Sequence, residues 1–109
     1  MNNHQITEDE LVKLINEDYK KMNEEEKYLW KEIKIQPVKW NQKPYGDSVN
    51  GFWVVGLLGK NVIWYNEIEE GFNESTYEIY GSIKEYFANQ DQLNWVVHNI
   101  LNRINNKNS

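Results

Sequence analysis

Two glutamates two positions apart, Glu67 and Glu69, are the residues whose spacing first suggests catalysis. Alternate residues of a strand point to the same face, so a strand through this region would place both carboxylates on one wall. With Trp and Tyr nearby, such a pair is typical of glycoside hydrolysis. Paired acids on a solvent-facing strand are more often plain surface, and we expect no catalytic role for this pair.

Other catalytic and metal-binding patterns are also missing from the sequence. Histidine is the usual base for a serine nucleophile, and the chain has two, His4 near its start and His98 in its last amphipathic segment. No serine stands in a nucleophile-elbow motif, and there is no cysteine for thiol chemistry or for a zinc site. Asp91 and His98 are seven residues apart, and no HxxxH or calcium-loop spacing occurs. The expectation is a non-enzymatic protein without metal or cofactor.

Negative charge is concentrated in the middle of the chain. Between Asn61 and Asp91 seven acids face a single base, Lys84, whereas the whole chain has a net charge of −5. A field of one sign attracts partners of the opposite sign and repels phosphate backbones. We therefore expect a basic partner and no nucleic acid, with the alternative that these carboxylates only keep the surface soluble.

Length and composition predict one domain over residues 1–109, with loose tails at 1–6 and 105–109. The first residues carry neither a basic nor an apolar signal region. The longest nearly apolar run, Phe52–Leu58, is far shorter than a membrane span. Together with the absence of cysteine, these features predict a cytoplasmic protein that does not enter a membrane.

The first half of the chain shows a helical pattern followed by a strand pattern. Thr7 and Glu10 form a capping-box sequence before apolar residues at helical spacing, which predicts one helix from about Glu8 to about Lys27. Alternating residues after Trp30 predict a strand, and Pro37 within it indicates an edge position or a bulge. The Asn-, Gly- and Pro-rich stretch 41–51 predicts a loop.

The second half contains the clearest hairpin. Strands at 52–58 and 62–68 flank Gly59-Lys60, which suits a two-residue type II′ turn. The implied register pairs Leu57 with Val62, Val55 with Trp64 and Trp53 with Asn66. This face is predicted to meet the core, and the opposite face, with Phe52, Val54, Ile63 and Tyr65, to be only partly covered.

A turn centred on Gly71, strands at 75–80 and 82–87, and a helix capped by Asn89 are predicted to follow. Apolar residues from Leu93 to Ile104 repeat at helical spacing. The order of elements predicts an α+β fold, in which a four- or five-stranded antiparallel sheet carries an N-terminal and a C-terminal helix on one face.

Two aromatic residues stand apart from the predicted core. Trp95 lies on the polar side of the last helix together with His98, and Trp is strongly enriched in binding hot spots. Phe72 lies in an acidic turn, where it either projects as an anchor or folds under as a plug. A neighbouring segment covering Trp95 is an equally good interpretation.

The amino-acid sequence of the second half of the chain resembles a family of small bacterial proteins of unassigned role. The block Val62-Ile63-Trp64-Tyr65-Asn66-Glu67-Ile68-Glu69-Glu70-Gly71-Phe72-Asn73 carries the resemblance, which extends to Gly51–Val55, Tyr80–Ile83 and Asn89–Leu93. The resemblance implies no catalytic residues. In size, acidity and lack of catalytic groups, the chain is also similar to immunity proteins of bacterial toxin systems.

The resulting hypothesis is stoichiometric binding of a basic protein, such as a toxin, through an acidic surface between Glu67 and Glu85. The residues predicted to contact the partner are Tyr65, Glu67, Glu69, Glu70, Phe72, Glu74, Glu78, Trp95 and His98. Two alternatives use the aromatic sheet face instead: a small-ligand or carbohydrate-binding module, and a homodimer that hides this face in its interface.

Overall fold

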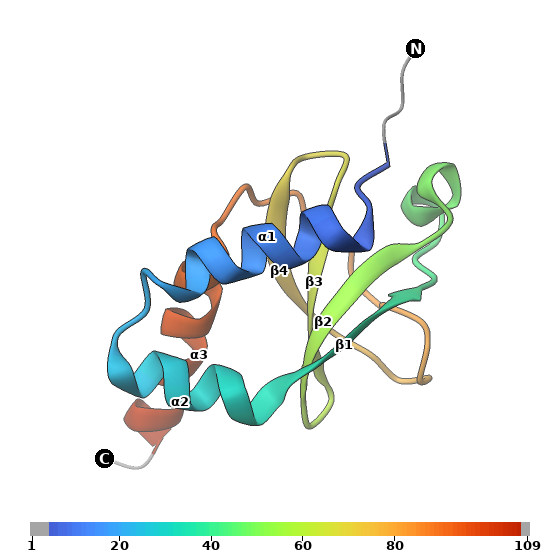
Figure 1. The fold of residues 1–109 in the computed structure, drawn as a ribbon. Coiled ribbons are helices and arrows are strands. Elements are labelled where there is room, and N and C mark those ends of the chain that lie inside the picture. Colours follow the sequence, from blue (N-terminus) through green and yellow to red (C-terminus); the bar gives the residue numbers. More distant parts are fainter. Residues whose placement is uncertain (1–4, 108–109) are drawn as a thin grey trace.

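The computed structural model describes residues 5–107 and confirms an α+β fold (Figure 1). Within this range three α-helices accompany a four-stranded antiparallel sheet with the order β1-β2-β3-β4. The elements are α1 (Glu8–Tyr19), α2 (Glu24–Ile33), β1 (Lys34–Trp40), a 3₁₀ turn (Tyr45–Val49), β2 (Phe52–Leu58), β3 (Asn61–Asn66), β4 (Gly71–Thr76) and α3 (Leu93–Lys107). No helix in the described range is both long and apolar enough to cross a membrane.

The single N-terminal helix predicted for residues 8–27 is wrong, because two helices occupy this region. The Thr7 capping box starts α1 as expected. A second capping box starts α2, where the Asn23 side chain accepts the Glu26 N–H at 2.8 Å and the Glu26 side chain accepts the Asn23 N–H at 3.0 Å. An N-cap residue has non-helical backbone angles, so a single helix cannot continue through Asn23. The first residues after Trp30, predicted to begin the strand, therefore belong to α2, which continues to Ile33.

The strand prediction around Pro37 is confirmed, because β1 is an edge strand and its register with β2 shifts between Lys34 and Val38. The β2–β3 turn also forms as predicted, with Gly59 at a φ of 60° and Leu57 paired with Val62. Beyond the turn the predicted register is wrong. A second irregularity in β2, between Val54 and Gly56, adds one residue, so Val54 pairs with Trp64 and Trp53 with Tyr65.

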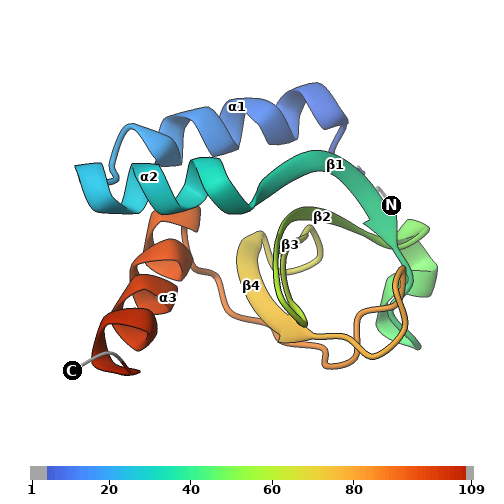
Figure 2. The ribbon, with the colours of Figure 1, turned by 90° about the horizontal axis from the view of Figure 1, so that it is seen from below.

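Both faces of the sheet are buried, which overturns the prediction of one covered and one partly covered face. The sheet curls strongly, with the helices outside it (Figure 2). The first core lies between sheet and helices and contains Val55, Ile63 and Tyr65. The second lies inside the curl and contains Phe52, Val54, Val62 and Trp64. Val54 and Val55 enter different cores because adjacent strand residues point to opposite faces, and the extra residue in β2 lets Gly56 face the first core as well.

The strands predicted at 75–80 and 82–87 are replaced by β4 and an irregular segment, 77–92. This segment runs beside β4, where the Phe72 N–H donates to the Asp91 carbonyl at 2.8 Å. Earlier in the segment, it reaches the end of β1, where the Ile83 N–H donates to the Asn41 carbonyl at 2.8 Å. Ile83 is buried in the second core. The segment therefore closes the open side of the curled sheet (Figure 2).

Gly71, predicted at the centre of a turn, is the first residue of β4. A Cβ atom there would lie 2.3 Å from the Asn89 carbonyl oxygen, so only glycine lets the irregular segment approach this closely. The turn itself precedes it and contains Glu70 at a φ of 59°.

The helix ends differ from the prediction at both termini. Helix α3 begins at Leu93 rather than after Asn89, and it continues to Lys107, so residues 105–107 are not a loose tail. Ile6, predicted to be part of the other tail, packs against the first core. Residues 1–4 and 108–109 of the predicted tails lie outside the described residues.

Candidate functional site

A pocket of about 450 Å³ lies between α1 and the β3–β4 turn. We call it the acidic pocket, because four carboxylate residues and one lysine line it. Its lining residues are Ile6, Glu10, Lys13, Leu14, Glu17, Tyr65, Glu67 and Glu70. Three of the nine residues predicted to contact a partner, Tyr65, Glu67 and Glu70, are thus brought together here.

One face of α1 supplies half of this lining. Glu10, Lys13, Leu14 and Glu17 are spaced by three or four residues, and such residues share one side of a helix. The helix is held in place by a different side, on which Leu11 is completely buried in the first core. The capping box orients the first turn, which contains Glu10.

The β3–β4 turn supplies the opposite wall, and Asn66 organises it. Asn66 is completely buried, and its side-chain oxygen accepts the N–H groups of Ile68 and Glu69 at 3.0 and 3.2 Å. Its side-chain nitrogen donates to the Phe87 carbonyl at 2.9 Å. These bonds satisfy the backbone of a tight turn and so hold Glu67 and Glu70 on the same side of it.

Glu67 is the most unusual group of the acidic pocket. Its side chain is only 4% exposed, and its Oε2 accepts the Ile6 N–H at 2.8 Å. Its Oε1 is buried, accepts no hydrogen bond from the described residues and lies 4.0 Å from the Lys39 ammonium. That ammonium donates to the Val49 carbonyl at 2.9 Å instead. A buried carboxylate oxygen without a donor is energetically costly, so an added donor would be bound favourably.

Tyr65 links the acidic pocket to the first core. It is 7% exposed, and its ring lies 4.9 Å from that of Phe72. Burial raises the pKa of its hydroxyl above the ordinary value of 10.0, and the neighbouring charges of Glu70, Glu67 and Asp18 raise it further. The same field that opposes a phenolate here favours a cation.

The raised pKa of Tyr65 predicts a loss of stability in alkali. The unfolded chain releases this proton near pH 10.0 and the folded chain only above it, so the free energy of unfolding falls from about pH 10 until the raised pKa is passed. Urea unfolding of Tyr65→Phe between about pH 8 and about pH 11 is expected to show a shallower fall than the parent. The exposed Tyr28→Phe is the control, and equal slopes for the parent and Tyr65→Phe would contradict the assignment.

The remaining acids of the predicted surface do not form a free anionic face. Arg103 binds Glu74 through two hydrogen bonds of 3.0 and 2.6 Å, and Lys84 binds Glu78 at 2.9 Å. Glu69 is half-buried in the turn. The predicted continuous surface from Glu67 to Glu85 is therefore corrected to the smaller acidic pocket.

Glu85 is engaged locally as well. Burial alone would raise its pKa, but the hydroxyl and N–H of Thr76 donate to the carboxylate at 2.6 and 2.7 Å and bring the pKa below 4.5. This carboxylate holds the irregular segment against β4 and is not available to a partner.

The predicted aromatic contacts separate into buried and exposed residues. Phe72 is 2% exposed and Tyr65 7%, so both are core residues and not surface anchors. Trp95 is 55% exposed on α3, and its ring meets that of His98 edge-on at 5.9 Å. His98 Nδ1 lies 2.7 Å from Glu26 Oε2. His98 thus joins α3 to α2, Trp95 stays exposed on α3, and neither residue lines the acidic pocket.

Sequence reasoning missed the contribution of α1 to the site. A usable signal was present, because Glu10, Leu14 and Glu17 follow the same three-and-four spacing as the buried residues, displaced around the helix. Acids near a helix start also have a simple capping role, which masked this second pattern.

Comparison with known proteins gives no match from which a function could be inferred. No protein-family model matches the chain, and neither a characterised protein nor a solved structure shows significant similarity to it. Among residues 5–107, no group of three or more His, Asp or Glu residues has the geometry to hold a metal ion. The function is accordingly argued from the acidic pocket itself.

Proposed function

We propose that this protein is a non-catalytic binding protein that docks on a basic protein partner and receives a lysine or arginine side chain of that partner in the acidic pocket. The observation that carries the proposal is Glu67, which lines the acidic pocket and whose buried Oε1 accepts no hydrogen bond from the described residues. Ammonium and guanidinium groups carry several donors and a positive charge, so they match this oxygen in both respects.

The buried residues of the pocket lining would bind the partner's side chain, and the exposed ones would attract it. Among the lining residues, the Glu67 side chain is only 4% exposed and Tyr65 only 7%, so both are largely desolvated. Glu17 and Glu70 are exposed and act on an approaching charge from a distance. Exposed charges mainly raise the association rate, whereas a desolvated charge pair slows dissociation.

An immunity role fits this arrangement. A toxin that acts on nucleic acid needs basic groups to hold phosphate. A carboxylate-lined pocket that captures such a group would occupy it stoichiometrically. The size and acidity of the chain support this role.

The two alternatives need an exposed aromatic face of the sheet, and both faces of the sheet are buried. Phe52 and Val54 are completely buried on one face, and Ile63 is 2% exposed on the other. A carbohydrate or a second copy would need one of these faces free. The acidic pocket is therefore favoured over both.

Replacing both pocket glutamates by glutamine, Glu67→Gln with Glu70→Gln, is expected to weaken binding of a blocked Gly-Arg-Gly peptide about tenfold. The peptide is titrated into isotope-labelled protein, and the affinity is read from amide NMR shifts of Tyr65 and Glu70. The control is Glu24→Gln with Glu25→Gln, which removes the same charge from the exposed start of α2. This control is expected to change the affinity less than about twofold.

Equal losses in the two double variants would show general attraction without a pocket and would contradict the proposal. A blocked Gly-Gln-Gly peptide that shifts the same amides would contradict the role of charge. The immunity role is tested separately, by purifying the chain together with the polypeptide encoded immediately before it. A complex that dissociates in the Glu67/Glu70 double variant is expected, and the absence of any complex would oppose the immunity role alone.

A further inference from the structure

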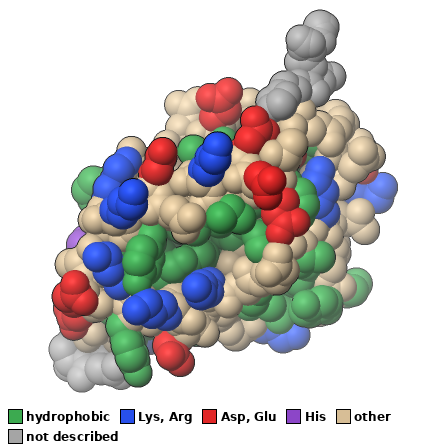
Figure 3. All heavy atoms as spheres, viewed as in Figure 1, with side chains coloured by type: hydrophobic (Ala, Val, Ile, Leu, Met, Phe, Trp, Pro, Cys, Tyr) green, Lys and Arg blue, Asp and Glu red, His purple; other side chains and the backbone are tan. Residues whose placement is uncertain are grey.

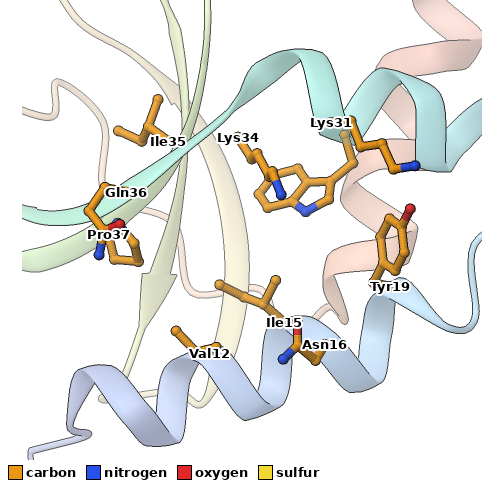
Figure 4. Close-up of a pocket in the computed structure, with 10 residues that line it drawn as sticks. Val12, Ile15, Asn16, Tyr19, Lys31, Lys34, Ile35, Gln36 and Pro37 are labelled. Atoms are coloured by element: carbon orange, nitrogen blue, oxygen red, sulfur yellow. The ribbon is translucent and has the colours of Figure 1, made fainter.

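A second hollow, of about 480 Å³, lies on the other side of α1, between this helix and the junction of α2 with β1. We call it the lysine-rimmed pocket. Figure 3 shows it as an apolar depression bordered by lysine side chains, and Figure 4 shows its walls. Its lining residues are Val12, Ile15, Asn16, Tyr19, Trp30, Lys31, Lys34, Ile35, Gln36 and Pro37.

The lysine-rimmed pocket has an apolar floor and one closed end. Trp30 is 3% exposed, and Ile15 packs with it against the first core. At the N-terminal end of α1, the Gln36 side chain donates to the Glu8 carboxylate at 2.6 Å and so joins β1 to α1. A volume of this size is in the range of small-molecule sites.

The charge of this pocket is opposite to that of the acidic pocket. Lys31 and Lys34 are exposed, and none of the ion pairs among the described residues involves them. Both lie across the hollow from Ile15 and Asn16 of α1 (Figure 4). Two ammonium groups above an apolar floor complement a molecule that has a negative head and an apolar body.

We propose that the lysine-rimmed pocket binds a small amphipathic anion, with its carboxylate or sulfonate at Lys31 and Lys34 and its hydrocarbon body against Ile15 and Trp30. An extended polypeptide added to the free edge of β1 is the less suitable occupant. Pro37 removes a backbone donor from the middle of this edge, as expected of a strand protected against such pairing. The inference is independent of the acidic pocket, which uses another face of α1.

The test uses anilinonaphthalene sulfonate, a fluorescent amphipathic anion, followed by its displacement with octanoate. Saturable one-to-one binding to the folded chain is expected. The change Lys31→Gln with Lys34→Gln should weaken binding at least about tenfold, because it removes both positive heads. The control Lys43→Gln with Lys60→Gln, two exposed lysines that do not line the pocket, should leave the affinity within about twofold.

A second variant tests the location without touching the core. Asn16 is exposed on α1 at the mouth of the pocket, so Asn16→Trp should fill the pocket, leave the circular dichroism spectrum unchanged and abolish binding. Displacement by octylamine as strongly as by octanoate would overturn the charge argument. Binding that survives Asn16→Trp or the Lys31/Lys34 change would overturn the proposal. So would the absence of saturable binding of the fluorophore or octanoate. An acidic peptide that displaces the fluorophore better than octanoate does would overturn it as well.

Discussion

Replacing Trp64 by alanine is expected to lower the free energy of unfolding by about 3–5 kcal/mol. Trp64 is completely buried in the second core, where its ring lies 4.8 Å from that of Phe52 and 6.0 Å from that of Tyr86. Its Nε1 donates to the Ser75 hydroxyl at 2.9 Å, and that hydroxyl donates in turn to the Glu85 carbonyl at 2.9 Å. Truncation leaves a large void and removes the donor that holds this chain of bonds.

The measurement is urea unfolding followed by circular dichroism, with Trp95→Ala as the matched control. Trp95 is 55% exposed, so the same truncation there should change the free energy of unfolding by less than about 1 kcal/mol. A loss for Trp64→Ala as small as that expected for Trp95→Ala would mean that the second core contributes little to stability. The difference between the variants therefore measures how far the inside of the curled sheet acts as a true core.

Replacing Asp18 by alanine is expected to destabilise the fold by about 2–3 kcal/mol. Asp18 lies in α1 and is 7% exposed, yet its Oδ2 accepts the N–H of Leu93, the first residue of α3, at 2.9 Å. It thus serves as the N-terminal cap of a helix that is distant in sequence. Without it, a buried N–H loses its acceptor and the positive end of α3 loses a compensating charge.

Asp18→Asn is expected to recover part of this loss, because its amide oxygen accepts the same hydrogen bond without the charge. Glu17→Ala is the control, since Glu17 is the exposed neighbour on the same helix and should alter stability by no more than about 0.5 kcal/mol. Equal unfolding midpoints for Asp18→Ala and Glu17→Ala would contradict the capping role. Helix α1 carries one wall of each pocket, so Asp18→Ala should also weaken binding at both.

Local patterns in the sequence determined several features correctly. The Thr7 capping box, the glycine of the β2–β3 turn and the edge position of Pro37 each follow from the chemistry of one to four neighbouring residues. The apolar stripe of the last helix and the order of elements predicted the α+β class for the same reason. Periodicity and capping act within one element, so they can be recognised without knowing what packs against it.

The tertiary structure decided which residues meet. Whether β2 gains a residue near Val55 depends on the two cores it must fill, and no local motif marks that irregularity. Asp18 and Leu93 are 75 residues apart, and Ile6 and Glu67 are 61 apart. The sequence alone therefore indicated an acidic α+β domain. Only long-range packing buried Tyr65 and Phe72, paired Glu74 with Arg103 and left Glu67 lining a pocket, because partners for charge and apolar surface are chosen by the fold as a whole.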